Sequence, residues 1–306
     1  MKRIVSPIKV FIVYNVRRVK DHFRPRAKPD KGETGDSKAD ERAFVKIQDL
    51  LPNLQYYNDS VIGPIKDRAE KVGFSDLESY YRFLLDHEEE REQLKTRFTY
   101  QSEIFFRGKD WDFFVEHCLS SFAGCESVRA WSAACSNGQE AYSVCLSLSD
   151  YVPLERIRVL ASDYDDRALE NCRTARYPAV ALMQIPKRFW RYALDIGGGL
   201  HPYFTFTDTL KSRVSTQNIN LLTDPFPEGF DVILCRNVLK FFTPEKICEV
   251  HKKLADSLKP GGYLFLSRDG DYNITGRISE PEKIGLLPLD CPWIYKKTGE
   301  PARPLP

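Results

Sequence analysis

The second half of the chain alternates short apolar runs with amphipathic stretches. Apolar runs typical of buried strands occupy Val128–Cys135, Ile157–Ser162, Asp231–Cys235 and Gly262–Ser267. Helical periodicity fills the segments between them, over Gln139–Ser149, Asp165–Thr174 and Pro244–Leu258. The last helix has Thr243 as its expected N-cap and Pro244 at its first position. Strands that alternate with helices predict an α/β fold built on a mostly parallel, doubly wound sheet.

The first half has a different pattern. Residues 27–42 contain almost nothing to bury, so we expect a flexible linker there. Ser75 and Glu78 form a capping box, which predicts a helix that starts at Ser75. Two apolar faces at helical spacing follow, one formed by Leu77, Tyr80, Tyr81 and Leu84 and one by Trp111, Phe114, Val115, Cys118 and Phe122.

These patterns divide the chain into three parts. We predict a basic N-terminal extension and linker over residues 1–41, a helical domain over 42–122 and the α/β domain over 123–306. A strand is expected at Lys9–Val16. Residues 177–215 replace an expected helix with a triple-glycine turn and an alternating run, which predicts a small antiparallel insertion.

Composition narrows the class of protein. Hydrophobic residues make up 42% of the 306 residues, and the net charge is +2, so the chain can form a core and is not a polyelectrolyte binder. The basic excess is local, with nine Lys or Arg against two Asp in residues 1–30. This segment is either a surface for an acidic partner or a solvated arm.

The cysteines and the first residues indicate a cytoplasmic protein. The eight cysteines contain no Cys-x-x-Cys pair or zinc-ligand spacing, and several lie in apolar runs, as reduced buried thiols do. Pro7 and Lys9 interrupt the apolar start, and no small-residue cleavage site follows it. No apolar run approaches the length needed to span a membrane.

Candidate ligand-binding residues follow the strands, because ligands of open α/β sheets bind at the carboxyl ends of the strands. After the first run, Gly138 would let a ligand approach the backbone beside a helix N-terminus, although an ordinary strand-to-helix turn is the alternative. After the second run, Asp163 could accept hydrogen bonds from ribose hydroxyls. The alternative is that Asp163 or Asp165 only caps the next helix, and we assign that role to Asp165.

Two further polar pairs follow strands. Arg236 and Asn237 end the third run, where a buried strand requires polar partners, or where a salt bridge and a turn amide would suffice. Asn220 and Leu221 follow the run Val214–Asn218 and could border an adenine or form a polar loop.

Several segments together resemble one protein family. They are FTYQSEIFFR, WSAACSNGQEAYS, VLASDYDDRALENCR, INLL, DVILCRNVLKFF and LKPGGYLFL. Their order and spacing resemble the chemoreceptor glutamate methyltransferases, the CheR family, over roughly residues 42–297. The resemblance implies a class I S-adenosylmethionine-dependent methyltransferase with a Rossmann-like doubly wound sheet, an N-terminal helical domain and a small antiparallel β insertion.

The resemblance also implies site residues. Arg107 would lie beside S-adenosylmethionine, Glu140 by its amino group and Asp163 by its ribose. Asn220 and Leu221 would border the adenine, and Arg236 and Asn237 would line the methyl-transfer end. Gln101 and Glu103 would complete the cofactor site. Catalysis would fall to Arg107, Arg236 and Asn237, and no metal is implied.

The chain departs from the family pattern at several positions. Gln101 and Glu103 stand where the family usually has Asn and Thr, and a carboxylate at 103 would repel the cofactor carboxylate. Phe241 replaces a common tyrosine after Cys-Arg-Asn. Other differences lie at Gln139, Lys240, Thr243 and residues 267–273. These changes bear on the efficiency of turnover more than on the fold or cofactor.

The implied activity is methyl transfer to glutamates of the cytoplasmic helix bundle of a chemoreceptor, which forms glutamyl methyl esters. A basic face of Lys66, Arg68 and Lys71 would meet the acidic receptor, or would simply be solvated. The alternatives are a cofactor-binding adaptor without turnover and a methyltransferase for another acceptor. The Asn/Asp-Pro-Pro-aromatic motif of nucleic-acid amino methyltransferases is missing, so no nucleic-acid partner is expected. We expect a monomer that is not membrane-inserted, and the insertion resembles a subdomain that binds a receptor tail in some members.

Overall fold

The computed structural model describes residues 37–51, 59–98, 104–195, 202–266 and 277–299. The chain forms two compact units, one of helices that ends at Lys95 and one built on a sheet that begins at Thr96. The strand expected at Lys9–Val16 and the triple-glycine turn at 197–199 lie outside the described residues.

The helical unit contains four helices among the described residues. They are α2 (Ser37–Leu50), α3 (Asp59–Lys71), α4 (Leu77–Asp86) and α5 (Glu88–Phe98). α4 packs against both α2 and α3. The side chains of Phe44, Ile47, Ile65, Tyr80 and Leu84 form its buried interior.

Two sequence predictions about this unit are wrong in detail. The expected linker does not extend to residue 42, because α2 begins at Ser37 and buries Ala43 and Phe44 about two turns further on. The N-cap of α4 is Asp76 and not Ser75, because the Asp76 carboxylate accepts a hydrogen bond from the backbone N–H of Ser79 at 2.8 Å.

A nearly buried ion pair joins α3, α4 and α5. Arg68 donates from Nε and Nη2 to the two carboxylate oxygens of Glu90, at 2.7 and 2.6 Å. The Tyr80 hydroxyl donates to the same carboxylate at 2.7 Å. Lys66 pairs with Asp40. Lys66 and Arg68 therefore have anionic partners within their own unit, and the expected basic face is not an open cationic surface.

The sheet unit contains seven strands in the order β6-β2-β1-β7-β8-β10-β9. Their bounds are β1 (Val128–Ala133), β2 (Ile157–Asp163), β6 (Val214–Asn218), β7 (Phe230–Cys235), β8 (Leu258–Leu266), β9 (Leu286–Pro288) and β10 (Ile294–Lys297). The five strands from β6 to β8 are parallel, whereas β10 runs antiparallel between β8 and β9. The predicted doubly wound, mostly parallel sheet is confirmed.

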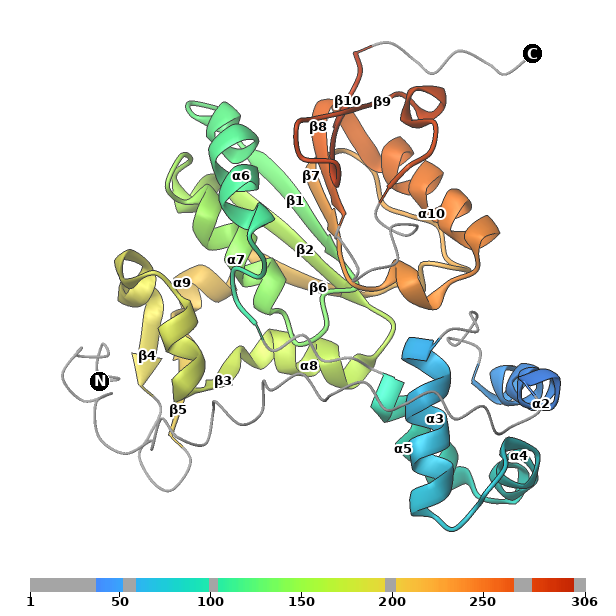
Figure 1. Ribbon diagram of the computed structural model, residues 1–306. Coiled ribbons are helices and arrows are strands. Elements are labelled where there is room, and N and C mark those ends of the chain that lie inside the picture. Colours follow the sequence, from blue (N-terminus) through green and yellow to red (C-terminus); the bar gives the residue numbers. More distant parts are fainter. Residues whose placement is uncertain (1–36, 52–58, 99–103, 196–201, 267–276, 300–306) are drawn as a thin grey trace. The chain divides into compact units, whose positions relative to one another are not determined.

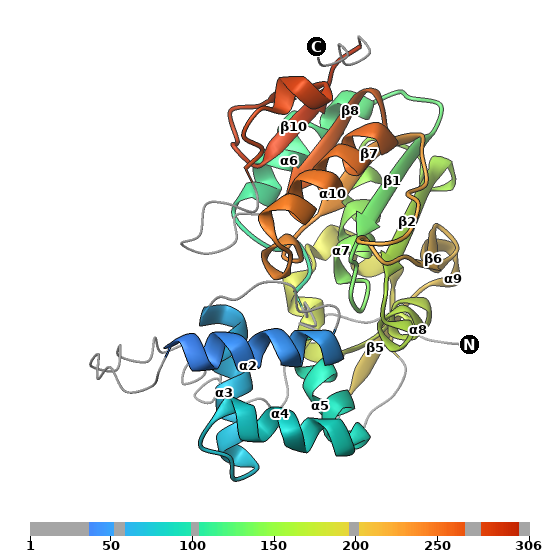
Figure 2. The same ribbon diagram turned by 90° about the vertical axis from the view of Figure 1, so that its right-hand side faces the viewer.

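Helices cover both faces of this sheet. They are α6 (Asp110–His117), α7 (Gln139–Leu148), α8 (Asp166–Thr174) and α10 (Pro244–Ser257), with α10 on the face opposite α6 and α7 (Figures 1 and 2). Trp131 packs with Leu254 on the α10 side, and Phe265 contacts Trp111 on the α6 side. The predicted caps at Thr243 and Asp165 are confirmed.

The last part of the predicted helical domain packs with the sheet. α6 and the following 3₁₀ turn, Leu119–Phe122, lie in the compact unit that begins at Thr96. The Trp111 indole N–H donates to Ser147 of α7 at 3.3 Å. The domain boundary at residue 122 stays a prediction, whereas the contacts of α6 are with the sheet unit.

The insertion is a small antiparallel sheet, as predicted. Its strands are β3 (Arg176–Pro178), β4 (Ala193–Asp195) and β5 (Tyr203–Phe206), in the order β3-β5-β4. Two 3₁₀ helices, η4 (Ala179–Gln184) and η5 (Lys187–Tyr192), lie between β3 and β4. Residues 214 and 215 belong to β6 of the main sheet, so the insertion ends before the predicted bound.

Within the described ranges, no helix combines the length and apolar character needed to cross a membrane. The eight cysteines are all described, and each is a free thiol.

The Arg68–Glu90 pair should dominate the stability of the helical unit. We expect Arg68→Met to lower its free energy of unfolding by about 3 kcal/mol, because it leaves the Glu90 carboxylate buried without its cation. Urea denaturation followed by circular dichroism measures this change. Lys71→Met, at an exposed position on the same helix, is the control and should change stability by less than about 0.5 kcal/mol. Equal effects of the two substitutions would contradict the assignment.

Candidate active site

The order of the strands places a topological switch point between β1 and β7, where open α/β sheets have a ligand-binding crevice at the carboxyl ends of the strands. The strand order reverses at this point, because β2 lies on one side of β1 and β7 on the other. Ala133 pairs with both Ser162 and Cys235, so the three strands end at the same level. Ligands of open α/β sheets bind at such a switch point.

The loop after β1 has an unusual backbone. Ala134, Ser136 and Gly138 adopt left-handed conformations, with φ of 62°, 50° and 90°. A left-handed residue other than glycine costs on the order of 1 kcal/mol or more and is found mostly at functional sites. At position 138 a side chain is also excluded by packing, because a Cβ atom would lie 2.5 Å from the Cys172 sulfur.

Asp163, at the end of β2, stabilises this loop. Its Oδ2 accepts a hydrogen bond from the backbone N–H of Ser136 at 2.8 Å, and its Oδ1 accepts from the N–H of Asp165 at 3.1 Å. Burial raises the pKa of the Asp163 carboxyl, and these N–H groups partly offset the rise. Asp163 thus lies in the crevice, whereas Asp165 caps α8.

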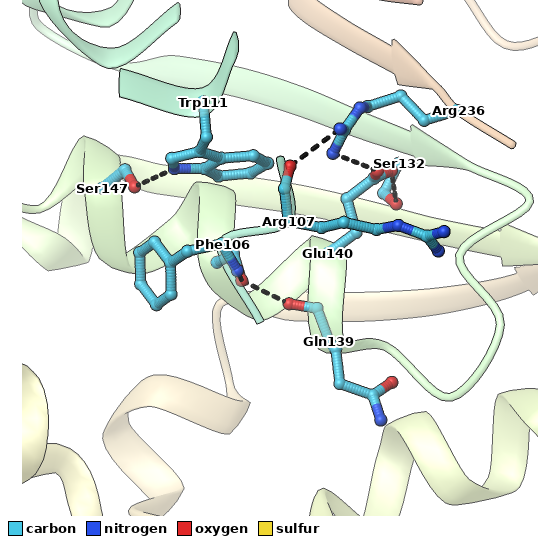
Figure 3. A network of polar contacts seen from close by, with 9 residues as sticks. Phe106, Arg107, Trp111, Ser132, Gln139, Glu140, Ser147 and Arg236 are labelled. Carbon is cyan, nitrogen blue, oxygen red and sulfur yellow. Dashed lines mark hydrogen bonds and ion pairs between the residues drawn. The ribbon is translucent and has the colours of Figure 1, made fainter. Parts of the chain in front are cut away.

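Glu140 and Arg236 meet across the crevice (Figure 3). Glu140 Oε1 accepts a hydrogen bond from the Ser132 hydroxyl at 2.8 Å, and Arg236 Nη1 lies 3.5 Å from Glu140 Oε2. Arg236 Nη2 donates to the backbone carbonyl of Arg107 at 2.8 Å. The guanidinium carbon lies 4.4 Å from the centre of the Phe265 ring and 5.7 Å from that of Trp111. Arg236 therefore joins three segments of the site.

The segment around Arg107 lies beside the start of α7. The backbone N–H of Phe106 donates to Ser143 Oγ at 2.9 Å, and Phe106 has a left-handed φ of 50°. The Arg107 charge counteracts the raised pKa of Glu140. Phe105 is only 2% exposed and packs in an aromatic cluster, so its role is in the core.

The remaining predicted residues are placed differently. The Asn220 side chain accepts a hydrogen bond from the backbone N–H of Leu222 at 3.0 Å, and Leu221 is buried in the core beside Trp131. Asn237 follows Arg236 with a left-handed φ of 62°. Gln101 and Glu103 lie outside the described residues. Adenine contacts by Asn220 and Leu221 stay a prediction.

Two residues not selected from the sequence also bear on the site. The Ser136 hydroxyl and the Gln139 side-chain oxygen are buried, and neither has a hydrogen-bond partner among the residues that the structure describes. Leaving such groups unsatisfied costs about 1–3 kcal/mol each, so a ligand that bonds to the Ser136 hydroxyl is favoured, whereas the Gln139 side chain points away from Glu140 and Arg236 (Figure 3). Ser136 and Gln139 flank Asn137 and Gly138 in the loop after β1. This position after a strand is the feature of the sequence that could have identified them.

The carboxylates of the site suit a polar, cationic organic ligand. The buried carboxylate of Asp163 ends β2, and the largely buried carboxylate of Glu140 lies in the first turn of α7. Over the described part of the chain, no group of three His, Cys, Asp or Glu side chains is arranged to hold a metal ion.

Comparison with known proteins shows to which family the chain belongs. The family described as "CheR methyltransferase, SAM binding domain" matches residues 101–272. The chain belongs to the CheR methyltransferase family. It is 30% identical over 205 residues to a chemotaxis protein methyltransferase of Listeria innocua, covering 65% of this chain and 74% of that protein. It is 28% identical to the chemotaxis protein methyltransferase of Escherichia coli over 70% of this chain and 77% of that protein.

The share of each relative's length that the chain matches differs from one relative to the next. The match to chemotaxis protein methyltransferase Cher2 of Pseudomonas putida, at 33% identity, spans 48% of this chain and only 56% of that protein. The predicted family, class I fold, enzyme class and cofactor are confirmed. The chain is an S-adenosylmethionine-dependent methyltransferase, and the carboxylates of Asp163 and Glu140 near the switch point suit that cofactor's hydroxyl and ammonium groups.

The protonation state of the Glu140 carboxyl should make cofactor binding depend on pH. Burial raises the pKa of Glu140 above its usual value, and Arg236 and Ser132 offset only part of the rise. A cationic ammonium favours the ionised carboxylate, so affinity should be full above this raised pKa and decline as the pH falls through it, at a higher pH than for a solvent-exposed glutamate. Calorimetry with S-adenosylhomocysteine measures the profile. Glu140→Gln should bind more weakly at neutral pH with a flatter profile, and an unchanged slope would refute the assignment.

Cofactor binding should depend on the planar, forked guanidinium of Arg236. We expect Arg236→Lys to weaken S-adenosylhomocysteine binding about tenfold, because an ammonium cannot contact the Arg107 carbonyl and Glu140 while stacking on Phe265. Arg129→Lys is a matched control, since Arg129 also donates to a carbonyl, that of Gly229, and stacks on Phe230. It lies at the opposite end of β1 and should leave affinity unchanged. Similar losses in both variants would show a general effect on the sheet.

Proposed function

We propose that this methyltransferase esterifies glutamate side chains on the cytoplasmic helix bundle of a chemoreceptor. The observation that carries the proposal is the network of Arg107, Glu140 and Arg236 at the switch point, in a chain that belongs to the CheR family. The relatives are named chemotaxis protein methyltransferases, which supports a receptor as the acceptor.

The chemistry requires little of the protein's side chains. A glutamate with a pKa of about 4.3 is already an anionic nucleophile at neutral pH, so no general base is needed. Its oxygen attacks the methyl carbon as the carbon–sulfur bond breaks, which gives a methyl ester and S-adenosylhomocysteine. Because opposite charges neutralise each other in this step, alignment of the reactants in a site of low polarity favours it.

We assign the residues of the site as follows. Glu140 binds the amino group of the cofactor, Asp163 its ribose, and Asn220 and Leu221 border the adenine. Arg107, Arg236 and Asn237 line the methyl-transfer end, where the cationic side chains attract the acceptor carboxylate. Gln101 and Glu103 complete the cofactor site.

The phenylalanine at position 241, a departure from the family pattern, favours a second function. Phe241 stands where the family commonly has a tyrosine, and its ring packs against the α10 core cluster. Without a hydroxyl at this position the chain could bind the cofactor as an adaptor or sensor and transfer the methyl group slowly or not at all. We propose a monomer in the cytoplasm in either case, with no nucleic-acid partner.

The test combines cofactor binding with methyl transfer. Asp163→Ala should weaken cofactor binding at least about tenfold, since it removes a buried acceptor and the partner of the Ser136 N–H. Glu170→Ala, at an exposed position on α8, is the control and should bind as the wild type does. The wild type should transfer a radiolabelled methyl group from S-adenosylmethionine to receptor-containing membranes as a base-labile ester.

Three results distinguish the alternatives. Alkali-stable label would indicate another acceptor atom. Binding without transfer to membranes that hold a cognate receptor would favour the adaptor. Restored transfer in Phe241→Tyr would then attribute the loss to the missing hydroxyl.

A further inference from the structure

The β insertion contacts the loop after β1 through one tyrosine hydroxyl. Tyr177, in β3, donates from its hydroxyl to the backbone carbonyl of Asn137 at 2.9 Å. Asn137 lies between Ser136 and Gly138, both of which are left-handed. The insertion therefore bonds to the backbone at the centre of this strained turn.

A second element contacts the side chain of the same residue. Asn171, on α8, donates from Nδ2 to Oδ1 of Asn137 at 3.0 Å. Asn137 is 8% exposed, and the bond from Tyr177 is buried, whereas the bond from Asn171 comes from an exposed position on α8. Its backbone carbonyl and its side chain are thus fixed from two directions, by β3 and by α8.

The Tyr177 donor is itself rigidly placed. Its ring is 2% exposed and packs against Phe105, Phe204 and Phe206. Burial raises the pKa of Tyr177 well above its usual value, so the hydroxyl keeps its proton. A donor with so little freedom loses almost no entropy when it bonds.

The loop needs such support because its backbone is strained. Ser136 pays the steric cost of a left-handed conformation, and without partners the turn would relax toward ordinary backbone angles. Asp163 fixes one end of the turn through the Ser136 N–H. The middle of the turn depends on Asn137 and its two partners.

We propose that Tyr177 and Asn171 are positioning residues, which act through Asn137 to keep the loop 134–138 in its cofactor-binding conformation. The inference rests on the proposed placement of the cofactor at this loop. The insertion contacts a second segment of the site as well, because Gln184 of η4 accepts a hydrogen bond from the Phe105 N–H at 2.9 Å. The insertion thereby contributes to cofactor affinity without touching the cofactor.

The chain offers a matched control for the Tyr177 hydroxyl. Tyr142 is 1% exposed, packs in the same aromatic cluster and donates to a backbone carbonyl, that of Cys172 on α8, at 3.1 Å. Tyr177→Phe and Tyr142→Phe each remove one buried hydroxyl from a comparable bond, so similar losses in melting temperature are expected. Of the two hydroxyls, that of Tyr177 bonds to the loop and that of Tyr142 bonds to α8.

The experiment measures the dissociation constant of S-adenosylhomocysteine by calorimetry, together with the melting temperature, for the full chain. We expect Tyr177→Phe to weaken binding about fivefold and Tyr142→Phe to change it by less than about twofold. Asn171→Ala alters an exposed position, so its folding is not at risk, and should weaken binding about threefold.

Equal weakening by Tyr177→Phe and Tyr142→Phe would overturn the proposal, as would wild-type binding by Asn171→Ala. If Tyr177→Phe does not fold, Asn171→Ala decides the outcome alone. Asp163→Ala separates this proposal from the placement of the cofactor. Unchanged binding in Asp163→Ala would refute the placement, whereas weakened binding there with unchanged binding in the other two variants would refute only the positioning role.

Discussion

The hydrogen bond from the Ser136 N–H to the Asp163 carboxylate is the interaction on which the site depends. At 2.8 Å it joins the turn after β1 to the end of β2. The turn stores strain in left-handed residues, and the sheet supplies the rigidity that maintains it. The loop leads into the start of α7, where the helix dipole and the carboxylates of Asp163 and Glu140 place polar groups beside an apolar sheet.

Much of the sheet unit was predictable because parallel strands buried on both faces give continuous apolar runs. The runs that predicted β1, β2 and β7 match those strands to within two residues, and the caps at Thr243 and Asp165 follow from local chemistry. The helical unit was harder to predict. Charged residues obscure the apolar face at the start of α2, and Ser75 and Asp76 are adjacent residues that can both cap a helix.

The site was only partly predictable for a different reason. Strand ends indicate Asp163 and Arg236, because topology alone brings them together. The pairing of Arg236 with the Arg107 carbonyl depends on a contact across 129 positions of sequence. Tyr177 has the pattern of an ordinary core aromatic, and nothing local shows where its hydroxyl points. Unsatisfied atoms such as the Gln139 side-chain oxygen are properties of the assembled interior.

The antiparallel position of β10 constrains how the sheet can be completed during synthesis. Strands β1, β2, β6, β7 and β8 emerge from the ribosome in an order that allows them to pair as they appear. β8 nevertheless keeps an unpaired edge until Ile294–Lys297 has been made, because Phe265 pairs with Ile294 and Leu264 with Tyr295. An apolar edge that stays open is a site for association between nascent chains. Pairing with β10 therefore covers an apolar edge of β8 that would otherwise be open to other chains.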